Sequence, residues 1–402
     1  MKPNNSKNNK LFNRNAVLSM LALNAPISRI ELANRSGLSK MSLTNIINEF
    51  SELGYIKEAG IDHSSLGKKK PILLELNDNC VCAVGINITR SYLEGCVCDI
   101  KGNIITSNCF DFNSHLTAEL LIEHIIKMVA ELIEVSNVKI SGIGISCIGP
   151  LDLQKGEILT PTNFYNISNL DVVSPVKAKF NIPVYLRRNN DCAILAEKFY
   201  GIARGINNVV FLGISGGVGA SAIINDKLIV GANGLSCEIG HTTIDINGEK
   251  CKCGNRGCLE LYANTDKVIS SAKECFETGK KITFKDVVTA AESGNALCKE
   301  IVDSFIKYVS IAITNLVKVY DPSLVVLGNT ITSGGTELLN AIKEEVATNC
   351  EFSNIDYSKF KENAPLMGAS AAVFDHNFFR NAKWRRIFIK CYVLNATKDE
   401  LL

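Results

Sequence analysis

The chain has 402 residues, of which 46% are hydrophobic and 21% charged, with 9 prolines. This composition excludes a disordered chain, and the length exceeds what one compact core accommodates, so we expect two or three domains. The net charge of +2 is unevenly distributed, because residues 1–70 hold 11 Lys and Arg against 5 Asp and Glu. A basic head on a slightly acidic body indicates that the head contacts nucleic acid.

The cysteines and the start of the chain bear on its compartment. The first ten residues are polar and no run of 18 apolar residues occurs. We therefore expect no secretory leader, no membrane span and a cytoplasmic protein. Of the 15 cysteines, pairs such as Cys80/Cys82 and Cys96/Cys98 alternate along segments expected to be strands. We interpret them as small buried residues in a reducing compartment, with a metal site as the alternative.

The first part of the chain is predicted to form three helices. Residues 1–12 are rich in Asn and Lys and are expected to be frayed, whereas apolar spacing predicts a helix over 13–26. A second helix is predicted over 29–36, ended by Gly37, and a third begins near Ser39. Three helices with a glycine turn between the last two are typical of a helix-turn-helix.

Two strand segments, 55–58 and 71–76, flank a turn with a basic tip, which makes the module a winged helix. Polar and basic groups at the start of the third helix and at this tip can reach base edges or phosphates. The candidate DNA-binding residues are Ser39, Lys40, Met41, Ser42, Thr44, Asn45, Lys68, Lys69 and Lys70. The alternative is a three-helix protein-interaction domain.

Strand and helix patterns alternate through the rest of the chain. Strands are predicted within 82–98 and over 103–109, 140–148, 184–186, 209–214 and 324–327. Helices are predicted over 118–134, 191–200, 266–277, 283–293 and 296–319. This alternation in two successive halves indicates an α/β architecture with a cleft between two lobes. The glycine run at 215–219 either approaches an anion or forms a strand–helix turn.

A histidine and three cysteines lie close together in the segment 231–260, with the spacing H-x9-C-x-C-x4-C. They are His241, Cys251, Cys253 and Cys258. One imidazole and three thiols are the ligand set of a closed tetrahedral zinc site, and the intervening glycines allow the sharp turns it needs. Because no position is left for water, the zinc would be structural. The alternative is a loop with ordinary reduced cysteines.

Two carboxylates, Glu238 and Glu260, bracket this cluster. A metal that fixes the loop between them would also fix both acceptors. Positioned acceptors beside an imidazole suit a polyhydroxylated ligand, since each hydroxyl that leaves water needs a hydrogen-bond partner. The alternative is that both are solvated surface charges.

The motifs CEIGH at 237–241 and CKCGNRGCLE at 251–260 resemble the signature of the ROK family, a group of sugar kinases and sugar-responsive repressors. The resemblance implies an α/β chain, with an N-terminal winged helix-turn-helix followed by a two-lobed actin-like domain. We expect the head at 1–77, the lobes at 78–190 and 191–375, and a basic tail at 376–402. The resemblance also implies zinc on the His and three Cys, and sugar on Glu238, Glu260 and the second ring nitrogen of His241.

Two positions separate an enzyme from a sensor. Kinases of the family carry D-x-G-G-T-K after the first strand, where this chain has NITRSY at 87–92. Thr89 and Arg90 replace both glycines and obstruct the backbone approach that a triphosphate needs, so we expect no useful ATP binding and no enzyme. Asp191 occupies the place of the family's catalytic base. Two positions before it, Asn189 replaces the Glu that the kinases usually have. Its alternative role is a helix N-cap.

A sugar site kept beside a lost nucleotide site indicates a sensor. The overall pattern is most similar to the xylose repressors of low-GC Gram-positive bacteria. We therefore expect a sugar-responsive DNA-binding repressor of carbohydrate-utilisation genes, with a monosaccharide, xylose first, in the interlobe cleft. The candidate sugar contacts are Asn163, Asn190, Asp191, Glu238, His241 and Glu260.

The expected partners are a palindromic DNA operator and further copies of the chain, as a homodimer or homotetramer. Two other functions stay open: a ROK-type ATP-dependent sugar kinase with a DNA-binding head, and a protein-interaction head on a sugar-dependent partner of a transport component. The tail at 376–402 carries basic residues. It is interpreted as an extra basic helix, a DNA or partner contact, or a segment without function.

Overall fold

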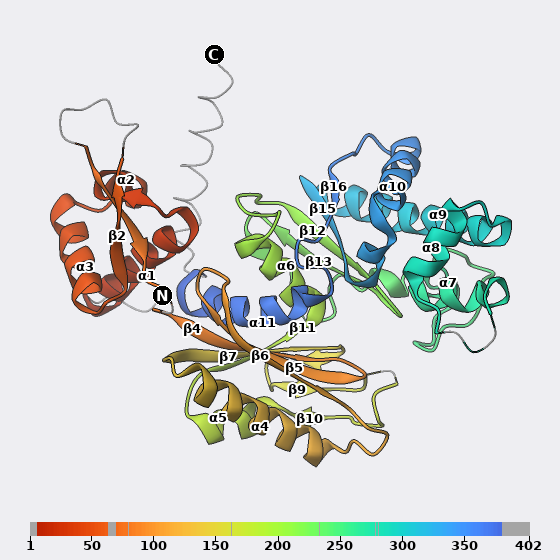
Figure 1. Cartoon of the computed structure of the whole chain (residues 1–402), viewed down its shortest axis with the longest axis horizontal. Coiled ribbons are helices and arrows are strands. Elements are labelled where there is room, and N and C mark those ends of the chain that lie inside the picture. Colours follow the sequence, from red (N-terminus) through yellow and green to blue (C-terminus); the bar gives the residue numbers. More distant parts are fainter. Residues whose placement is uncertain are drawn as a thin grey trace. The chain divides into compact units, whose positions relative to one another are not determined.

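The computed structural model (Figure 1) describes residues 6–62, 70–78, 80–161, 163–232, 234–277, 279 and 281–379. The chain divides into two compact units: Met1–Ile145 with Val172–Leu186 and Ala369–Leu402, and Ser146–Asp171 with Arg187–Gly368. Among the described residues, no helix combines the length and the apolar character that a membrane crossing requires.

The first unit begins with a winged helix, as expected from the sequence. Its helices are α1 (Ser6–Asn24), α2 (Arg29–Ser36) and α3 (Lys40–Glu52), and its strands are β1 (Ile27–Ser28), β2 (Ile56–Ile61) and β3 (Ile72–Leu76), in the order β1-β3-β2. Ser28 and Ser39 cap α2 and α3, each accepting a 3.2 Å hydrogen bond from the backbone N–H three residues on. Gly37 ends α2 at φ +64°, a conformation that favours glycine.

The start of the first helix was predicted wrongly. Helix α1 begins at Ser6 rather than near residue 13, so residues 6–12 are helical. Two cations on α1 pair with Glu49 of α3: Lys10 Nζ lies 3.9 Å and Arg14 Nη2 2.9 Å from its carboxylate oxygens. These tertiary ion pairs help to extend a helix whose first turns lack apolar spacing. Strand β2 also continues past the predicted end, to Ile61.

A five-stranded sheet, ordered β11-β7-β4-β5-β6, follows the head. Its strands are β4 (Cys82–Ile88), β5 (Tyr92–Asp99), β6 (Ile104–Asp111), β7 (Ile140–Cys147) and β11 (Val184–Arg188). Helices α4 (Ala118–Ser136) and α5 (Val173–Phe180) lie on one face and α11 (Ala364–Phe374) on the other (Figure 1). On β7, Gly144 allows close approach of α11, because a Cβ there would lie 1.8 Å from the Ala369 carbonyl oxygen.

The alternating cysteines of this sheet are core residues. Cys82, Cys96 and Cys98 are fully buried, and Cys80 is half-buried. Burial raises the pKa of Cys96 to about 12, so this thiol stays protonated at neutral pH. Within the described part of the chain these thiols form no cluster with the geometry of a metal site. The interpretation as small buried strand residues is confirmed for Cys82, Cys96 and Cys98, whereas Cys80 lies before β4.

The second unit is built on a second five-stranded sheet, ordered β14-β13-β12-β15-β16. Its strands are β12 (Val209–Ile214), β13 (Val218–Ile224), β14 (Lys227–Leu228), β15 (Leu324–Gly328) and β16 (Ile355–Tyr357). The short strands β8 (Leu151–Asp152), β9 (Glu157–Ile158) and β10 (Leu170–Asp171) pair separately. The helices are α6 (Asn189–Tyr200), α7 (Thr265–Ser271), α8 (Phe284–Glu292), α9 (Ala296–Tyr320) and α10 (Gly335–Asn349).

Apolar faces of this sheet and its helices form one core. Leu212 on β12, Phe284 on α8 and Phe305 on α9 belong to one buried cluster, in which the two phenyl rings meet with centroids 5.3 Å apart. Helix α6 contacts β12 and β13, and α8 and α10 pack against α9. Burial of these apolar groups is the main stabilising contribution to the unit. The unit places α6 and the β12–β13 turn beside the candidate site.

Two predicted elements of this unit are corrected. The glycine run at 215–219 is a hairpin, because Ser215 N–H bonds to the Gly217 carbonyl at 2.9 Å and β13 returns antiparallel to β12. It is therefore not a strand–helix turn. Helix α7 ends at Ser271 instead of 277, since the chain tightens there into a 3₁₀ turn, Lys273–Cys275, with hydrogen bonds between residues three apart.

A buried carboxylate ties the end of α6 to the loop after β16. Glu197 is fully buried and accepts hydrogen bonds from Ser358 Oγ at 2.6 Å, Phe360 N at 3.2 Å and Ile202 N at 3.0 Å. Gly201 makes room for it, because a Cβ there would lie 1.9 Å from Glu197 Oε2. The carboxylate thus satisfies donors from two loops that would otherwise be buried without partners.

Replacing Glu197 with alanine is expected to lower the free energy of unfolding by roughly 3 kcal/mol or more, because each orphaned donor costs about 1–3 kcal/mol. Urea titration of the full chain, followed by circular dichroism, measures the loss. The control is Glu300→Ala, which removes an exposed carboxylate on α9. Equal midpoints for the two variants would contradict the role given to Glu197.

Candidate functional site

The predicted ligands His241, Cys251, Cys253 and Cys258 come together in the second unit. His241 ends the 3₁₀ turn Ile239–His241, and the three cysteines lie between it and the 3₁₀ turn Leu259–Leu261. The ligand atoms of all four are within 4.8 Å of one another. Cys251 Sγ is 3.8 Å from His241 Nδ1, and Cys253 Sγ is 3.6 Å from Cys258 Sγ. The four residues form what we call the His–Cys cluster.

The spacing of the cluster fits a tetrahedral metal ion. Zinc with Zn–S bonds of about 2.3 Å sets neighbouring sulfurs about 3.8 Å apart. The 3.6 Å separation between Cys253 Sγ and Cys258 Sγ is close to that value. The donor set, one nitrogen and three sulfurs, is also the set that zinc prefers for structural sites. The four residues present can hold a metal ion, since their ligand atoms all lie within 4.8 Å of one another.

Turns within the loop aim these side chains at one point. The Ile244 N–H bonds to the Gly257 carbonyl at 2.9 Å, and the Gly257 N–H bonds to the Glu249 carbonyl at 2.8 Å. Gly257 has φ +61°, and a Cβ there would lie 1.7 Å from the Asp245 carbonyl oxygen. Only glycine is compatible with both restrictions. Asn255 Nδ2 adds a 3.1 Å hydrogen bond to the His241 carbonyl.

The thiols of the cluster differ in acidity. A backbone hydrogen bond from Asn255 lowers the pKa of Cys253, whereas burial raises the pKa of Cys258 to about 12. Metal ligation requires the thiolate, so a cation must offset the desolvation of Cys258. The Nδ1 atom of His241 faces the sulfurs, which leaves Nε2 for another partner.

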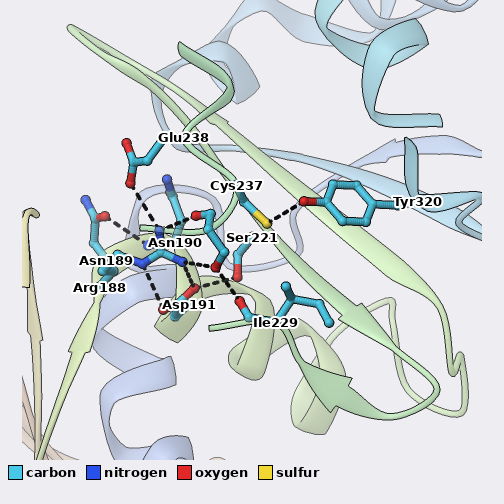
Figure 2. Close-up of polar contacts among 10 residues, drawn as sticks. Arg188, Asn189, Asn190, Asp191, Ser221, Ile229, Cys237, Glu238 and Tyr320 are labelled. Carbon is cyan, nitrogen blue, oxygen red and sulfur yellow. Dashed lines mark hydrogen bonds and ion pairs between the residues drawn. The ribbon is translucent and has the colours of Figure 1, made fainter. Parts of the chain in front are cut away.

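A second polar group, centred on Arg188 at the end of β11, joins two of the candidate sugar contacts (Figure 2). Arg188 Nε and Nη2 donate to the two carboxylate oxygens of Asp191 at 3.0 and 2.9 Å. Arg188 Nη1 donates to Glu238 Oε1 at 3.1 Å and to the Ser236 carbonyl oxygen. Each guanidinium nitrogen thus donates to a protein acceptor.

Asp191 is enclosed by this group. Its side chain is 0% exposed, and besides the bonds from Arg188 it accepts a 2.6 Å hydrogen bond from Ser221 Oγ on β13. Because α6 begins at Asn189, Asp191 lies within the first turn and is not the N-cap, which corrects that alternative. An N-terminal first turn favours a negative charge. The carboxylate is stabilised by a bidentate ion pair, a hydroxyl and the helix terminus.

Burial and charge compete at Arg188. Burial acts to lower the pKa of its guanidinium, but the charge and hydrogen bonds of Asp191, followed by the charge of Glu238, raise the pKa above its ordinary value. Arg188 therefore stays protonated. A permanent cation at this place offsets the charge of the carboxylate that the sequence suggested as a base.

Glu260 lies against the hairpin turn between β12 and β13. Its Oε2 atom accepts a 3.1 Å hydrogen bond from Val218 N. A Cβ on Gly217 would lie 3.0 Å from Glu260 Oε2, and one on Gly216 would lie 2.5 Å from Asp266 Oδ2. An anion that approached these glycines would meet two carboxylates, which disfavours phosphate at this turn.

The remaining candidates for sugar contact have different surroundings. All six lie in the second unit. Asn190 packs against the glycines of β12 and β13, and its Oδ1 atom is buried without a hydrogen-bond partner. Asn163 is exposed, with φ +56°. Within the described residues no hydrogen bond joins it to the other candidates.

The segment 87–92 forms the hairpin turn between β4 and β5. Thr89 Oγ1 donates to the Tyr92 carbonyl at 2.9 Å and accepts from Ser91 N at 3.2 Å and Tyr92 N at 3.0 Å. Asn87 is buried, and its Nδ2 donates to Glu94 Oε1 at 2.7 Å. The Thr89 side chain thus accepts hydrogen bonds from the backbone N–H groups of Ser91 and Tyr92.

The DNA-binding candidates lie at the start of α3 and in the wing. Those described are all exposed: Ser39, Lys40, Met41, Ser42, Thr44, Asn45 and Lys70. Lys68 and Lys69 lie outside the described residues. Two hydroxyls already serve the helix, since Ser39 is the N-cap and Thr44 Oγ1 donates to the Lys40 carbonyl at 2.8 Å. Lys40, Met41 and Asn45 therefore have the side chains most available to a partner.

Sequence reasoning named Asp191 and Glu238 but missed Arg188, which pairs with both. The sequence signal was a pair of arginines, Arg187 and Arg188, at the end of an apolar strand, immediately before the Asn189-Asn190-Asp191 motif. A cation at the end of a buried strand needs a nearby carboxylate. That rule points to Asp191, but only the folded chain shows that Glu238, 50 residues away, shares the guanidinium.

Comparisons with known proteins agree with this architecture. A family model described as "ROK family" matches residues 83–376, and one described as "Winged helix-turn-helix DNA-binding" matches residues 13–57. The xylose repressor of Bacillus subtilis (strain 168) is 31% identical over 376 residues, which cover 91% of this chain and 96% of that protein.

Two crystal structures show the same fold. A ROK family transcriptional regulator, a homologue of the Escherichia coli MLC protein, has a TM-score of 0.77 at 22% identity and covers 96% of this chain and 99% of its own. A ROK glucokinase from Streptomyces griseus, in complex with glucose and AMPPNP, has a TM-score of 0.64 at 21% identity and covers 72% and 98%.

Proposed function

Because the chain belongs to the ROK family, we propose that it is a sugar-responsive DNA-binding transcriptional repressor of carbohydrate-utilisation genes. One observation carries the proposal: a winged helix with an exposed, basic start of α3 is joined to a ROK body with carboxylates around a His–Cys cluster. Sugar phosphorylation by a kinase does not require a DNA-binding domain. This activity would place the protein in the cytoplasm.

The proposed effector is a neutral monosaccharide, with xylose as the first candidate. The 31% identity to a xylose repressor over 91% of the chain supports that choice. The proposed contacts are Asn163, Asn190, Asp191, Glu238, His241 and Glu260, in the interlobe cleft that the sequence suggested. Structural zinc on the His–Cys cluster would fix the loop that carries Glu238 and Glu260 at its two ends.

The proposed response is a population shift. The effector favours one state of the body, and the spacing of the heads in a homodimer or homotetramer then no longer matches a palindromic operator. A full reversal of DNA occupancy requires the effector to discriminate between the two states by about 5.5 kcal/mol. The proposed boundaries are 1–77 for the head, 78–190 and 191–375 for the lobes, and 376–402 for the tail.

The second candidate function is an ATP-dependent sugar kinase. The likeness to a glucokinase fold is the observation in its favour. Three observations argue against it. Thr89 closes the turn at 87–92 with its own hydrogen bonds, and the carboxylates of Glu260 and Asp266 lie beside the glycine turn. The guanidinium of Arg188 is paired with Asp191. A general base must be free to take the substrate's proton, and an ion-paired, fully buried carboxylate is poorly suited to that role. We therefore propose that the chain is not an enzyme.

The direct test uses DNA from upstream of the chain's own gene in a fluorescence anisotropy titration, with xylose, glucose or N-acetylglucosamine added. Specific binding that one sugar alters supports a sugar-responsive repressor. A coupled assay of ATP hydrolysis with the same sugars tests the kinase. Turnover at enzymatic rates would replace the proposal, and DNA binding that no sugar alters would remove its regulatory part.

The exposed residues of α3 give a prediction for DNA binding. Asn45→Ala is expected to weaken specific binding by about 1–3 kcal/mol and to relax specificity at the base pair it contacts, whereas Lys40→Ala should weaken binding to all sequences and reduce the salt slope by about 1. Competition titrations at several salt concentrations separate the two effects. Lys127→Ala, which removes an exposed cation from α4, is the matched control. If Lys127→Ala reduced the slope as Lys40→Ala does, the head would not be the site of contact.

A further inference from the structure

Arg188 connects two carboxylates that differ in their exposure. The Asp191 side chain is 0% exposed, whereas the Glu238 side chain is 43% exposed. Both receive N–H donors from the same guanidinium, whose own side chain is 6% exposed. One end of this group is therefore fixed in the interior and the other end reaches solvent.

The buried end has the geometry of a permanent anchor. Two parallel hydrogen bonds of 3.0 and 2.9 Å make a bidentate ion pair between Arg188 and Asp191, and Ser221 Oγ holds the same carboxylate at 2.6 Å. Removing one partner would leave an uncompensated buried charge, so the pair stays closed in the folded protein. The whole Asp191 side chain is buried.

The other end of Arg188 holds a short segment, Ser236–Glu238. The guanidinium donates to the Ser236 carbonyl, to Ser236 Oγ at 3.3 Å and to Glu238 Oε1 at 3.1 Å. Between these residues, Cys237 adopts φ +61°, a conformation unusual for a residue other than glycine, and its Sγ lies 3.2 Å from Tyr320 OH. Figure 2 shows Arg188 and Tyr320 holding the segment from opposite sides.

We propose that Arg188 is a positioning residue for the effector: anchored on buried Asp191, it fixes the Ser236–Glu238 segment and so aims the Glu238 carboxylate at the sugar. Asp191 then acts on the effector through the guanidinium. That Glu238 is aimed at a sugar rests on the proposed function, whereas the contact of Arg188 with the Ser236–Glu238 segment does not. A lysine does not match the arginine, because its compact ammonium lacks the planar fork that binds Asp191 through two parallel hydrogen bonds while a third nitrogen reaches Glu238.

The first test needs no effector. Cys237 reports on the segment, since its thiol is half-buried while the segment is held. In Arg188→Lys the rate of Cys237 alkylation by iodoacetamide, followed by peptide mass spectrometry, is expected to rise at least about fivefold relative to the exposed Cys109, because local opening becomes easier. Arg187→Lys is the control, since adjacent strand residues face opposite sides. An unchanged Cys237 rate would overturn the proposal, whatever any sugar does.

The second test uses xylose and the other sugars of the panel. Arg188→Lys and Asp191→Asn are each expected to weaken the binding of the sugar that stabilises the wild type by about tenfold, the loss of one charge-assisted hydrogen bond. The double variant should be no weaker than the weaker single variant, because both changes act through one guanidinium. Additive losses, or wild-type affinity in Arg188→Lys, would overturn the positioning role.

The two tests fail independently. If no sugar binds the wild type, the proposed function fails, yet the Cys237 measurement still decides whether Arg188 holds the segment. Metal content and thermal midpoint without sugar are recorded for each variant. A folded Arg188→Lys variant with faster Cys237 labelling and weaker sugar binding is the result we expect.

Discussion

Replacing Cys258 with serine is expected to remove the metal from the protein and to loosen the loop between Thr242 and Glu260. Wild-type protein should carry about one zinc per chain after dialysis, and the variant close to none, because a closed tetrahedral site needs all four ligands. Structural zinc contributes about 10–16 kcal/mol in small zinc-binding domains, so even partial loss of ligation is a large change. Elemental analysis of both proteins gives the stoichiometry.

The physical reason for the size of the effect is the position of Cys258. It is fully buried, it pairs across an isolated bridge with Thr243, and its pKa is raised to about 12 by burial. A hydroxyl there neither ionises nor matches the softness of sulfur. The loop would lose the cation that offsets the desolvation of the thiolates, and the ends that carry Glu238 and Glu260 would lose their common support.

The matched control is Cys109→Ser, which changes an exposed cysteine on β6 outside the His–Cys cluster. It should keep the zinc content and thermal midpoint of the wild type. Wild-type protein prepared without chelators that contains no zinc would refute the metal site itself. Zinc retained by Cys258→Ser at full stoichiometry would show that the ion is held elsewhere.

The parts of this molecule that the sequence predicts well are those encoded locally. The His–Cys cluster is formed within a single loop, so ligand spacing and the glycines at 254 and 257 are enough to find it. The same holds for α2 and α3, whose limits follow from Ser28, Gly37 and Ser39. In each case the residues that decide the structure are close neighbours along the chain.

Features that depend on distant residues could not be predicted in this way. The early start of α1 involves Lys10 and Arg14 pairing with Glu49 of another helix. The role of Asp191 depends on a guanidinium from β11 and a hydroxyl from β13. No periodicity or motif encodes such pairs, because each requires the tertiary structure to bring separate elements together.

The loss of effector response in Glu260→Gln is the second large expected effect. Glutamine keeps an oxygen that can accept the 3.1 Å hydrogen bond from Val218 N, so the hairpin turn keeps its support. What is lost is the negative charge that strengthens a hydrogen bond from a sugar hydroxyl. A hydrogen bond to a charged group contributes about 1.5–3 kcal/mol, which corresponds to a roughly 10- to 150-fold weaker affinity.

Thermal shift titrations with xylose, glucose and N-acetylglucosamine measure this loss, because a ligand that binds only the folded state raises the midpoint by mass action. Asp266→Asn is the matched control, since its carboxylate lies beside Gly216 of the same hairpin but is not a proposed sugar contact. Its titration should follow that of the wild type. Weaker binding in Asp266→Asn with full affinity in Glu260→Gln would move the sugar to the other side of the glycine turn, and the proposed contact set would then be wrong.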